Sequence, residues 1–139
     1  MARLTVEVPL RWGDMDAFGH VNNATTVQLL EQARVTGWFD GQREVADVVV
    51  AKNTVEYLSP IPYTREPIEV EMWLARLGGS SITVHYEVFS RIDGNRVLTT
   101  RAETVVVFLD EGLGTPRRLS TEERAAWAEY VEAPLQFRR

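Results

Sequence analysis

Residues 12–23 concentrate the side chains of this sequence that could do chemistry. The carboxylates of Asp14 and Asp16, the imidazole of His20 and two asparagines lie within them. Apolar residues at helical spacing follow, so the free amides of a helix N-terminus would lie beside these side chains and favour negative charge. A carboxylate can attack an acyl carbon or activate water, and such amides stabilise an oxyanion. These groups are the minimum equipment for acyl transfer.

The same residue types also have a structural interpretation. Asp, Gly and Asn gather before helices because they favour turns and caps, and Asn22 or Asn23 is a natural N-cap. A metal site made by Asp14, Asp16 and His20 is disfavoured, because a single Asp-x-Asp pattern is common. The residues alone leave both interpretations open and favour the structural one.

The elements that must position this segment follow in a clear order. Alternating residues 3–11 predict a strand, and residues 12–22 predict a loop. Residues 23–38 predict a helix that is apolar on several sides and therefore buried. Valine-rich or alternating runs predict four more strands at residues 46–58, 67–77, 81–92 and 96–109.

Turn and cap signals separate these elements. Gly78-Gly79 predicts a turn, and residues 93–95 (Asp-Gly-Asn) predict a tight hairpin. Ser120 and Glu123 match a capping box that opens a second helix over residues 120–132, after which the last residues are expected to fray.

This order of elements predicts an α+β fold in a single domain of residues 1–139. Consecutive hairpins favour an antiparallel sheet, and a twisted sheet can curl around one apolar helix and bury it. One sheet and one helix leave sheet edges uncovered, so a dimer that continues the sheet is expected.

The composition narrows the possible functions. The chain has no cysteine, which excludes disulfides, zinc–thiolate sites and a cysteine nucleophile. The net charge of −5 argues against broad nucleic-acid binding, since phosphate contacts need a basic face. No Gly-x-Ser-x-Gly elbow is present, so a serine-triad hydrolase is disfavoured. Charges interrupt the N-terminal apolar stretches, so we expect no signal peptide or membrane span, and a cytoplasmic protein.

Two stretches also match a known family. Residues 14–23 read Asp-Met-Asp-Ala-Phe-Gly-His-Val-Asn-Asn and residues 30–34 read Leu-Glu-Gln-Ala-Arg. Together they resemble the opening motif of the 4-hydroxybenzoyl-CoA thioesterase-like family. Weaker matches lie at residues 56–60 and 78–81 and in the last strand, so the resemblance extends from about Val6 to about Leu109.

The resemblance implies a hotdog fold, which is an antiparallel sheet wrapped around a long central helix, in a homodimer or homotetramer. It implies hydrolysis of acyl-CoA thioesters without a metal, with coenzyme A present only as part of the substrate. The family's catalytic aspartate falls on Asp16, as nucleophile or general base. The backbone amide that polarises the carbonyl falls on Asn23, and Gly19 lies in the loop that lets the substrate approach.

The chain departs from the family's namesake at one point. The namesake type carries aromatic residues and a proline where this chain has Asn22-Asn23-Ala24. The variant found here looks like the branch that acts on fatty or general acyl groups, which argues against an aromatic substrate.

Other residues of the segment are given roles beside Asp16. His20 either orients Asp16 or contacts the thioester, or it is a packed loop histidine, whereas Asp14 is expected to bond loop amides. Asn22 and the serines of the glycine turn, Ser80 and Ser81, are candidate substrate contacts. The candidates for coenzyme A phosphates are Arg91 and Arg96 beside the hairpin, followed by Arg76, Arg117 and Arg118.

Several further residues receive structural interpretations. Glu31 and Arg34 lie one helical turn apart and are read as an internal pair or an interface contact, with Glu31 as the reserve carboxylate. His85 lies on a polar strand face and is expected to be exposed. The tryptophans are expected in the core or at an interface; they are Trp12, Trp38, Trp73 and Trp127.

Three other functions stay open on the same fold, because a fold alone does not decide function. The first is a thioesterase that acts on acyl-carrier protein, which the negative charge makes less favoured. The second is a sensor that binds acyl-CoA without cleaving it. The third is a hydratase or dehydratase, which expects an acid–histidine arrangement that this sequence lacks.

Overall fold

The computed structural model describes residues 2–39, 48–112 and 114–138. The chain forms, in order, β1 (Leu4–Val8), a 3₁₀ turn (Trp12–Asp14), α1 (Asn23–Arg34), a π-helical turn (Val35–Phe39), β2 (Val48–Tyr57), β3 (Ile68–Leu77), β4 (Ser81–Ile92), β5 (Asn95–Phe108) and α2 (Thr121–Ala128). Among the described residues, no helix has the length and apolarity needed to cross a lipid bilayer.

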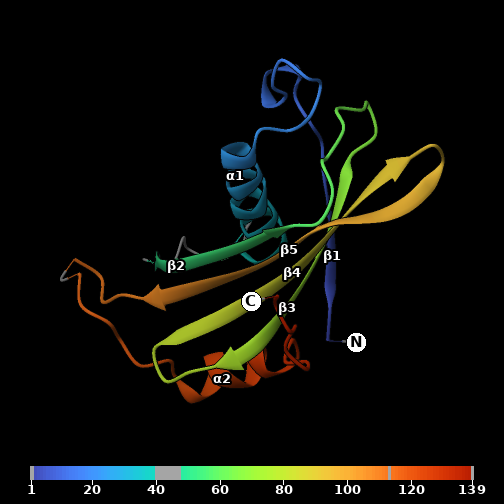
Figure 1. Ribbon diagram of the computed structural model, residues 1–139. Helices are drawn as coiled ribbons and strands as arrows, with labels where there is room; N and C mark the ends of the chain where they lie inside the picture. Colours follow the sequence, from blue (N-terminus) through green and yellow to red (C-terminus); the bar gives the residue numbers. More distant parts are fainter. Residues whose placement is uncertain (1, 40–47, 113, 139) are drawn as a thin grey trace.

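The five strands form one antiparallel sheet in the order β1-β3-β4-β5-β2 (Figure 1). β1 and β2 are therefore the two edge strands, although they are neighbours among the strands of the sequence. The chain between them carries α1 across one face of the sheet. The predicted α+β hotdog arrangement of a sheet around one helix is confirmed. The expected pairing of consecutive strands holds for β3, β4 and β5 and is wrong for β2, which pairs with β5 and not with β3.

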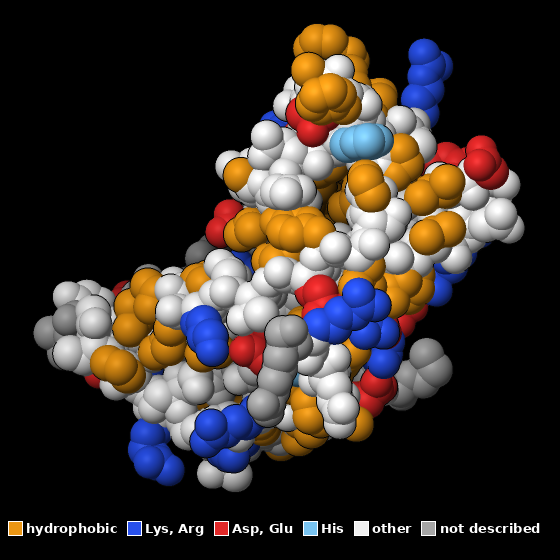
Figure 2. Space-filling view, in the orientation of Figure 1, with side chains coloured by type: hydrophobic (Ala, Val, Ile, Leu, Met, Phe, Trp, Pro, Cys, Tyr) orange, Lys and Arg blue, Asp and Glu red, His pale blue; other side chains and the backbone are white. Residues whose placement is uncertain are grey.

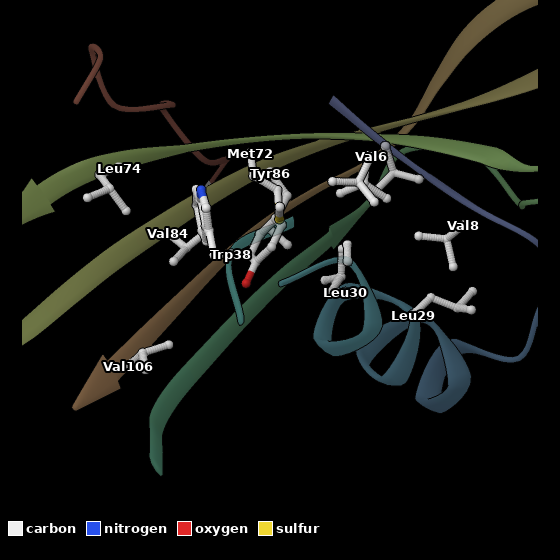
Figure 3. Packing of buried hydrophobic residues seen from close by; sticks show 14 of the residues in the cluster. Val6, Val8, Leu29, Leu30, Trp38, Met72, Leu74, Val84, Tyr86 and Val106 are labelled. Carbon is white, nitrogen blue, oxygen red and sulfur yellow. The ribbon is translucent and has the colours of Figure 1, made fainter. Parts of the chain in front are cut away.

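The face of the sheet toward α1 forms the hydrophobic core. Figure 3 shows Leu30 and Trp38 turned toward Met72, Val84 and Tyr86 of the sheet, and all five are buried. The strict alternation of β3 and β4 places every second side chain on this face. These contacts hold α1, and with it the loop that precedes α1, in a fixed position on the sheet.

The end of the helical segment approaches the sheet more closely than a regular side chain would allow. A Cβ atom at Gly37 would lie 2.8 Å from Leu4 Cδ2 and 2.9 Å from Met72 Cε. Trp38 follows and packs edge-on against Trp127 of α2, with 5.3 Å between the ring centroids. α2 therefore closes the core beyond the end of α1.

The opposite face of the sheet carries charged pairs and is crossed by residues 131–138. The indole Nε1 of Trp73 donates to the Ala133 carbonyl at 3.1 Å, and the Leu135 amide donates to His85 Nδ1 at 2.9 Å. The Arg138 amide donates to the carboxylate of Glu56 on β2 at 2.7 Å. We call residues 131–138 the C-terminal strap.

The strap corrects two predictions. His85 was predicted to be exposed, but it is 2% exposed because the strap covers it. The chain end was predicted to fray, but its amides and carbonyls bond to the sheet as far as Arg138. The sequence pattern of β4 marked a polar face correctly and could not show that distant residues cover that face.

The predicted boundaries agree closely with the elements. β1 is shorter than predicted because Pro9 follows Val8 and has no N–H to donate to a neighbouring strand. The predicted helix of residues 23–38 is α-helical to Arg34 and ends in the π-helical turn, and the second helix covers 121–128 of the predicted 120–132. Residues 46 and 47 of the predicted second strand lie outside the described residues.

Candidate active site

A pocket of about 310 Å³ lies between the loop that precedes α1 and the chain that follows β2. Both segments rise at the top of Figure 1, where the loop is drawn in blue and residues 58–67 in green. Hydrophobic side chains lie at the tip of this end of the molecule in Figure 2, and Trp12 and Phe18 of the loop are 74% and 83% exposed. The pocket is lined by Asp16, His20, Val21, Asn23, Thr26, Tyr57, Leu58, Ser59, Pro60 and Ile61.

Asp14 is the structural carboxylate of the loop. It is 1% exposed and accepts hydrogen bonds from the backbone amide of Arg11 at 2.7 Å and from Arg11 Nη2 at 2.9 Å. Its carbonyl accepts the Asn22 amide at 3.0 Å, which ties the start of the loop to the start of α1. This agrees with the structural role predicted for Asp14, although the partners lie before it in the chain.

Asp16 is held by the loop and faces the pocket. Its Oδ1 accepts the amides of Phe18 at 2.8 Å and His20 at 3.2 Å, and its own amide donates to the His20 carbonyl at 2.7 Å. Gly19 completes this tight turn with φ of +76°, a conformation that side chains disfavour. Within the described chain Oδ2 of Asp16 has no hydrogen-bond partner, so one carboxylate oxygen is oriented and the other is available.

The first turn of α1 supplies a backbone amide that can bind an oxyanion, that of Asn23. Asn22 is the N-cap, and its Oδ1 accepts the Ala24 amide at 2.8 Å. The Asn23 amide has no acceptor among the described residues, and Asn23 lines the pocket together with Asp16. A free amide at a helix N-terminus stabilises negative charge that develops in front of it.

His20 contributes to the site in two ways. Its backbone amide, rather than its ring, bonds Asp16. His20 lines the pocket, and its ring makes no hydrogen bond within the described chain. The structure therefore supports a substrate-facing position for the ring and gives no contact through which the ring would orient Asp16.

The second wall of the pocket comes from residues 57–61, to which the sequence reasoning assigned no role. The Val21 amide donates to the Ile61 carbonyl at 2.8 Å, and this bond joins the two walls. The Tyr57 hydroxyl donates to the Asn23 carbonyl at 2.8 Å, and burial raises the pKa of Tyr57. Thr26 is buried and lines the floor one turn along α1. Residues 56–60 formed part of the family resemblance, which was the only sequence signal for this wall.

The remaining candidate contacts lie elsewhere in the chain. Ser80 and Ser81 form the turn between β3 and β4, next to α2 and at the opposite end of the molecule from the pocket (Figure 1). Glu69 and Glu71 accept hydrogen bonds from Arg96, each at 2.6 Å. Arg91 lies 3.7 Å from Glu69. None of these candidates lines the pocket, so their contact with substrate stays a prediction.

Glu31 and Arg34 of α1 also lie outside the pocket. Arg34 is buried and donates to the Tyr86 hydroxyl at 2.9 Å, whereas the Glu31 carboxylate is 69% exposed and lies 4.0 Å from Arg34. Among the residues that the structure describes, no three His, Asp or Glu side chains are grouped closely enough to hold a metal ion.

Residues 10–134 match the thioesterase-like superfamily. The chain belongs to this superfamily. It is a thioester hydrolase, and the predicted resemblance to thioesterases of the 4-hydroxybenzoyl-CoA type is confirmed.

Solved structures agree with the family. A protein of Xanthomonas campestris proposed to be an acyl-CoA thioesterase is 35% identical, with 84% of this chain and 98% of that chain covered and a TM-score of 0.68. A thioesterase of Thermus thermophilus in complex with coenzyme A and Zn is 31% identical, with 91% and 93% covered and a TM-score of 0.74. The fold of the present chain also matches that of 4-hydroxybenzoyl-CoA thioesterase at 14% identity, with 91% of this chain and 99% of that chain covered and a TM-score of 0.77.

Proposed function

We propose that this thioesterase hydrolyses acyl-CoA thioesters in the pocket between the loop and the second wall. The observation that carries the proposal is that Asp16, whose carboxylate is oriented by two amides, and Asn23, whose amide has no acceptor among the described residues, line the same pocket. The relatives support coenzyme A as the carrier of the acyl group, because one relative is proposed to act on acyl-CoA and another was solved with coenzyme A bound.

The thioester carbonyl would accept a hydrogen bond from the Asn23 amide, which stabilises the oxyanion as the carbonyl carbon is attacked. In one version Asp16 Oδ2 attacks this carbon, the C–S bond breaks, and the coenzyme A thiolate leaves and takes a proton. Water then hydrolyses the acyl–aspartyl anhydride. In the other version Asp16 takes a proton from water while the water oxygen attacks the carbon; the C–S bond then breaks, and the leaving coenzyme A thiolate takes that proton from Asp16. Neither version requires a metal.

A homodimer is part of the proposal. Within the described residues, each of the two edge strands pairs on one side only, and β2 carries exposed Val49 and Val50 (46% and 42% exposed). An unpaired edge with apolar side chains is a template for pairing with another chain. Pairing at β2 would bring a second copy close to Tyr57 and the second wall.

Thiol release from a panel of short, long and aromatic acyl-CoAs tests the function. The wild type is expected to turn over, and Asp16→Asn is expected to lose at least about 100-fold in kcat, the size of an acid–base contribution. Glu122→Gln is the matched control, because its side chain is exposed on α2 and lies outside this pocket. Equal release by wild type and Asp16→Asn would contradict the role of Asp16. Binding without release would indicate a sensor.

A single turnover in ¹⁸O-labelled water separates the two versions. Label in the Asp16 carboxylate requires the anhydride and its opening at the Asp16 carbon. Label confined to the released acid is expected for direct attack by water and also for an anhydride that opens at its acyl carbon. Trapping of the acyl-enzyme by hydroxylamine distinguishes these two cases, because only the anhydride can be trapped. Inhibition of thiol release by free coenzyme A, compared with inhibition by free acyl-carrier protein, tests which of the two carries the acyl group.

A further inference from the structure

Tyr57 bridges the two walls of the pocket at the point where α1 begins. Its hydroxyl donates to the carbonyl oxygen of Asn23 at 2.8 Å, and Asn23 is the first residue of α1. The ring of Tyr57 also lines the pocket. One side chain from the edge strand therefore reaches the residue whose amide is expected to bind the oxyanion.

The base of this bridge is firmly anchored. Tyr57 is the last residue of β2 and pairs with Thr100 of β5. The next two amides, those of Leu58 and Ser59, both donate to the Thr99 carbonyl, at 2.9 and 3.1 Å. Thr99 and Thr100 are fully buried in the sheet. The backbone that carries Tyr57 is therefore held by the sheet, whereas the side chain is 44% exposed and is tied to α1 by its hydroxyl.

The hydroxyl of Tyr57 acts as a donor to the helix and not as an acid toward substrate. Burial raises the pKa of Tyr57, so the hydroxyl keeps its proton through the neutral pH range. That proton is engaged by the Asn23 carbonyl. Tyr57 cannot give the same proton to a leaving group without breaking its bond to α1.

Two further contacts at the start of α1 come from the loop side, and one residue before the cap the Val21 amide bonds the Ile61 carbonyl of the opposite wall. The side chain of Asn22 accepts the Ala24 amide at 2.8 Å, and the Asn22 amide donates to the Asp14 carbonyl at 3.0 Å. Both belong to the loop before the helix, whereas the Tyr57 contact comes from the opposite wall. An amide stabilises an oxyanion only when it lies at the right place, and small displacements lower the rate strongly.

We propose that Tyr57 is a positioning residue whose hydroxyl fixes the Asn23 amide at the place where the thioester oxyanion forms. The proposal rests on the function proposed above. It assigns a catalytic consequence to an edge-strand residue that does not itself exchange a proton with the substrate. It also predicts how the defect divides between kcat and KM.

The test is Tyr57→Phe, which removes the hydroxyl and keeps the ring as a pocket wall. We expect kcat for acyl-CoA to fall by about tenfold, because the oxyanion contact is loosened but not removed. We expect KM, and the affinity for a non-hydrolysable acyl-CoA thioether, to stay within about twofold, because the pocket wall is intact. Tyr130→Phe is the matched control, because Tyr130 packs against Trp38 and Trp127, far along the fold from the pocket.

A second measurement reports the position of the helix without any reaction. Hydrogen–deuterium exchange of the first turn of α1 is expected to be faster in Tyr57→Phe than in the wild type, and unchanged in Tyr130→Phe. An active Tyr57→Phe with wild-type kcat would overturn the proposal. So would a defect confined to KM, or unchanged exchange in the first turn.

Failure of the proposed function gives a different pattern. If the wild type releases no thiol from any acyl-CoA, both the function and the catalytic consequence of Tyr57 are overturned. The exchange measurement then still shows whether the hydroxyl holds the helix. If the wild type is active and Tyr57→Phe matches it, the function stands and the role of Tyr57 alone is lost.

Discussion

The pocket and the opposite face of the sheet differ in how their polar groups are used, although Glu56 Oε1 and Arg101 Nε on the opposite face are also buried without a hydrogen-bond partner among the described residues. At the pocket, Oδ2 of Asp16, the ring of His20 and the amide of Asn23 have no hydrogen-bond partner within the described chain. On the opposite face, Arg3 bonds the carboxylates of Glu71, Glu87 and Glu132 at distances of 2.5 to 3.0 Å.

The buried histidine of the opposite face shows the same pairing. The amide of Leu135 donates to His85 Nδ1, so Nδ1 is an acceptor and Nε2 carries the hydrogen that Glu103 accepts at 2.8 Å. Both ring nitrogens are used. By contrast, the ring of His20 faces the pocket with neither nitrogen bonded in the described chain.

The difference separates groups that stabilise from groups that are available to a ligand. A polar group bonded on all sides contributes to stability, and removing its partner leaves a desolvated group behind. A polar group that is oriented but keeps one free atom can bind or react. The predictions below test whether stability and catalysis can be damaged independently.

The two carboxylates of the loop should separate most sharply. Asp16→Asn is expected to lower kcat at least about 100-fold and to leave the free energy of unfolding within about 0.5 kcal/mol. Asp14→Asn is expected to lower the free energy of unfolding by about 1–3 kcal/mol, because donors from Arg11 lose a buried acceptor. Chemical denaturation and thiol-release assays on both variants measure whether stability and kcat are lost separately. A comparable stability loss in the two variants would argue against it.

Removal of the C-terminal strap should damage stability and spare the chemistry. A chain that ends at Tyr130 loses the bonds to Trp73, His85 and Arg3, and its free energy of unfolding is expected to fall by about 2–4 kcal/mol. A chain that ends at Phe137 is the control, since it keeps these bonds. kcat per folded molecule, measured well below the midpoint of thermal unfolding, is expected to stay within about twofold of wild type, since the side-chain hydrogen bonds of the strap go to Arg3, Trp73, His85 and Glu56, which do not line the pocket. A large loss of kcat would show that the two faces are coupled.

Local signals made most of the fold predictable. Alternation gave the strands, and the run of Asn22 and Asn23 before an apolar stretch gave the start of α1, because these signals depend on neighbours in the chain. The acid and the amide of the site were assigned through the family resemblance, which rests on one short loop and helix start, whereas the residue types alone favoured a structural role for Asp16 and Asn23.

Contacts between distant residues were not predictable. The strap buries His85 from a position 50 residues further along the chain, and Tyr57 reaches Asn23 across 34 residues. No periodicity in either segment encodes such a pairing. The second wall of the pocket was therefore missed as a set of functional residues, although its sequence had been noted as part of the family resemblance.

The two N-caps of the chain offer a matched pair for the comparison. Asn22 caps α1 at the pocket and Ser120 caps α2 at the far end, each by accepting an amide of the first turn. Replacing either residue by alanine is expected to cost about 1 kcal/mol of stability. Only Asn22→Ala is expected to lower kcat as well, because the Asn22 cap holds the peptide group that carries the Asn23 amide. Equal kcat in the two variants would show that the cap does not position the amide.

The smallest expected effect lies at α2 and depends on pH. Arg117 donates hydrogen bonds to both oxygens of Glu123, each at 2.8 Å, and this lowers the pKa of Glu123 to about 2. A carboxyl whose pKa is lower in the folded state stabilises the fold above its unfolded value near 4.3 and loses that contribution as the pH falls toward 2. Because the pair is about one-third exposed, Glu123→Gln is expected to cost only about 0.5–1 kcal/mol at pH 7.

The difference between Glu123→Gln and the wild type should shrink through the window from pH 4.5 to pH 2, because the wild-type carboxyl becomes protonated and loses its charge there. Urea unfolding at a series of pH values measures this difference directly. Thiol release at pH 7 should be unaffected, since α2 lies away from the pocket. A stability difference that stays constant down to pH 2 would mean that the capping geometry, rather than the charge of Glu123, supplies its contribution to α2.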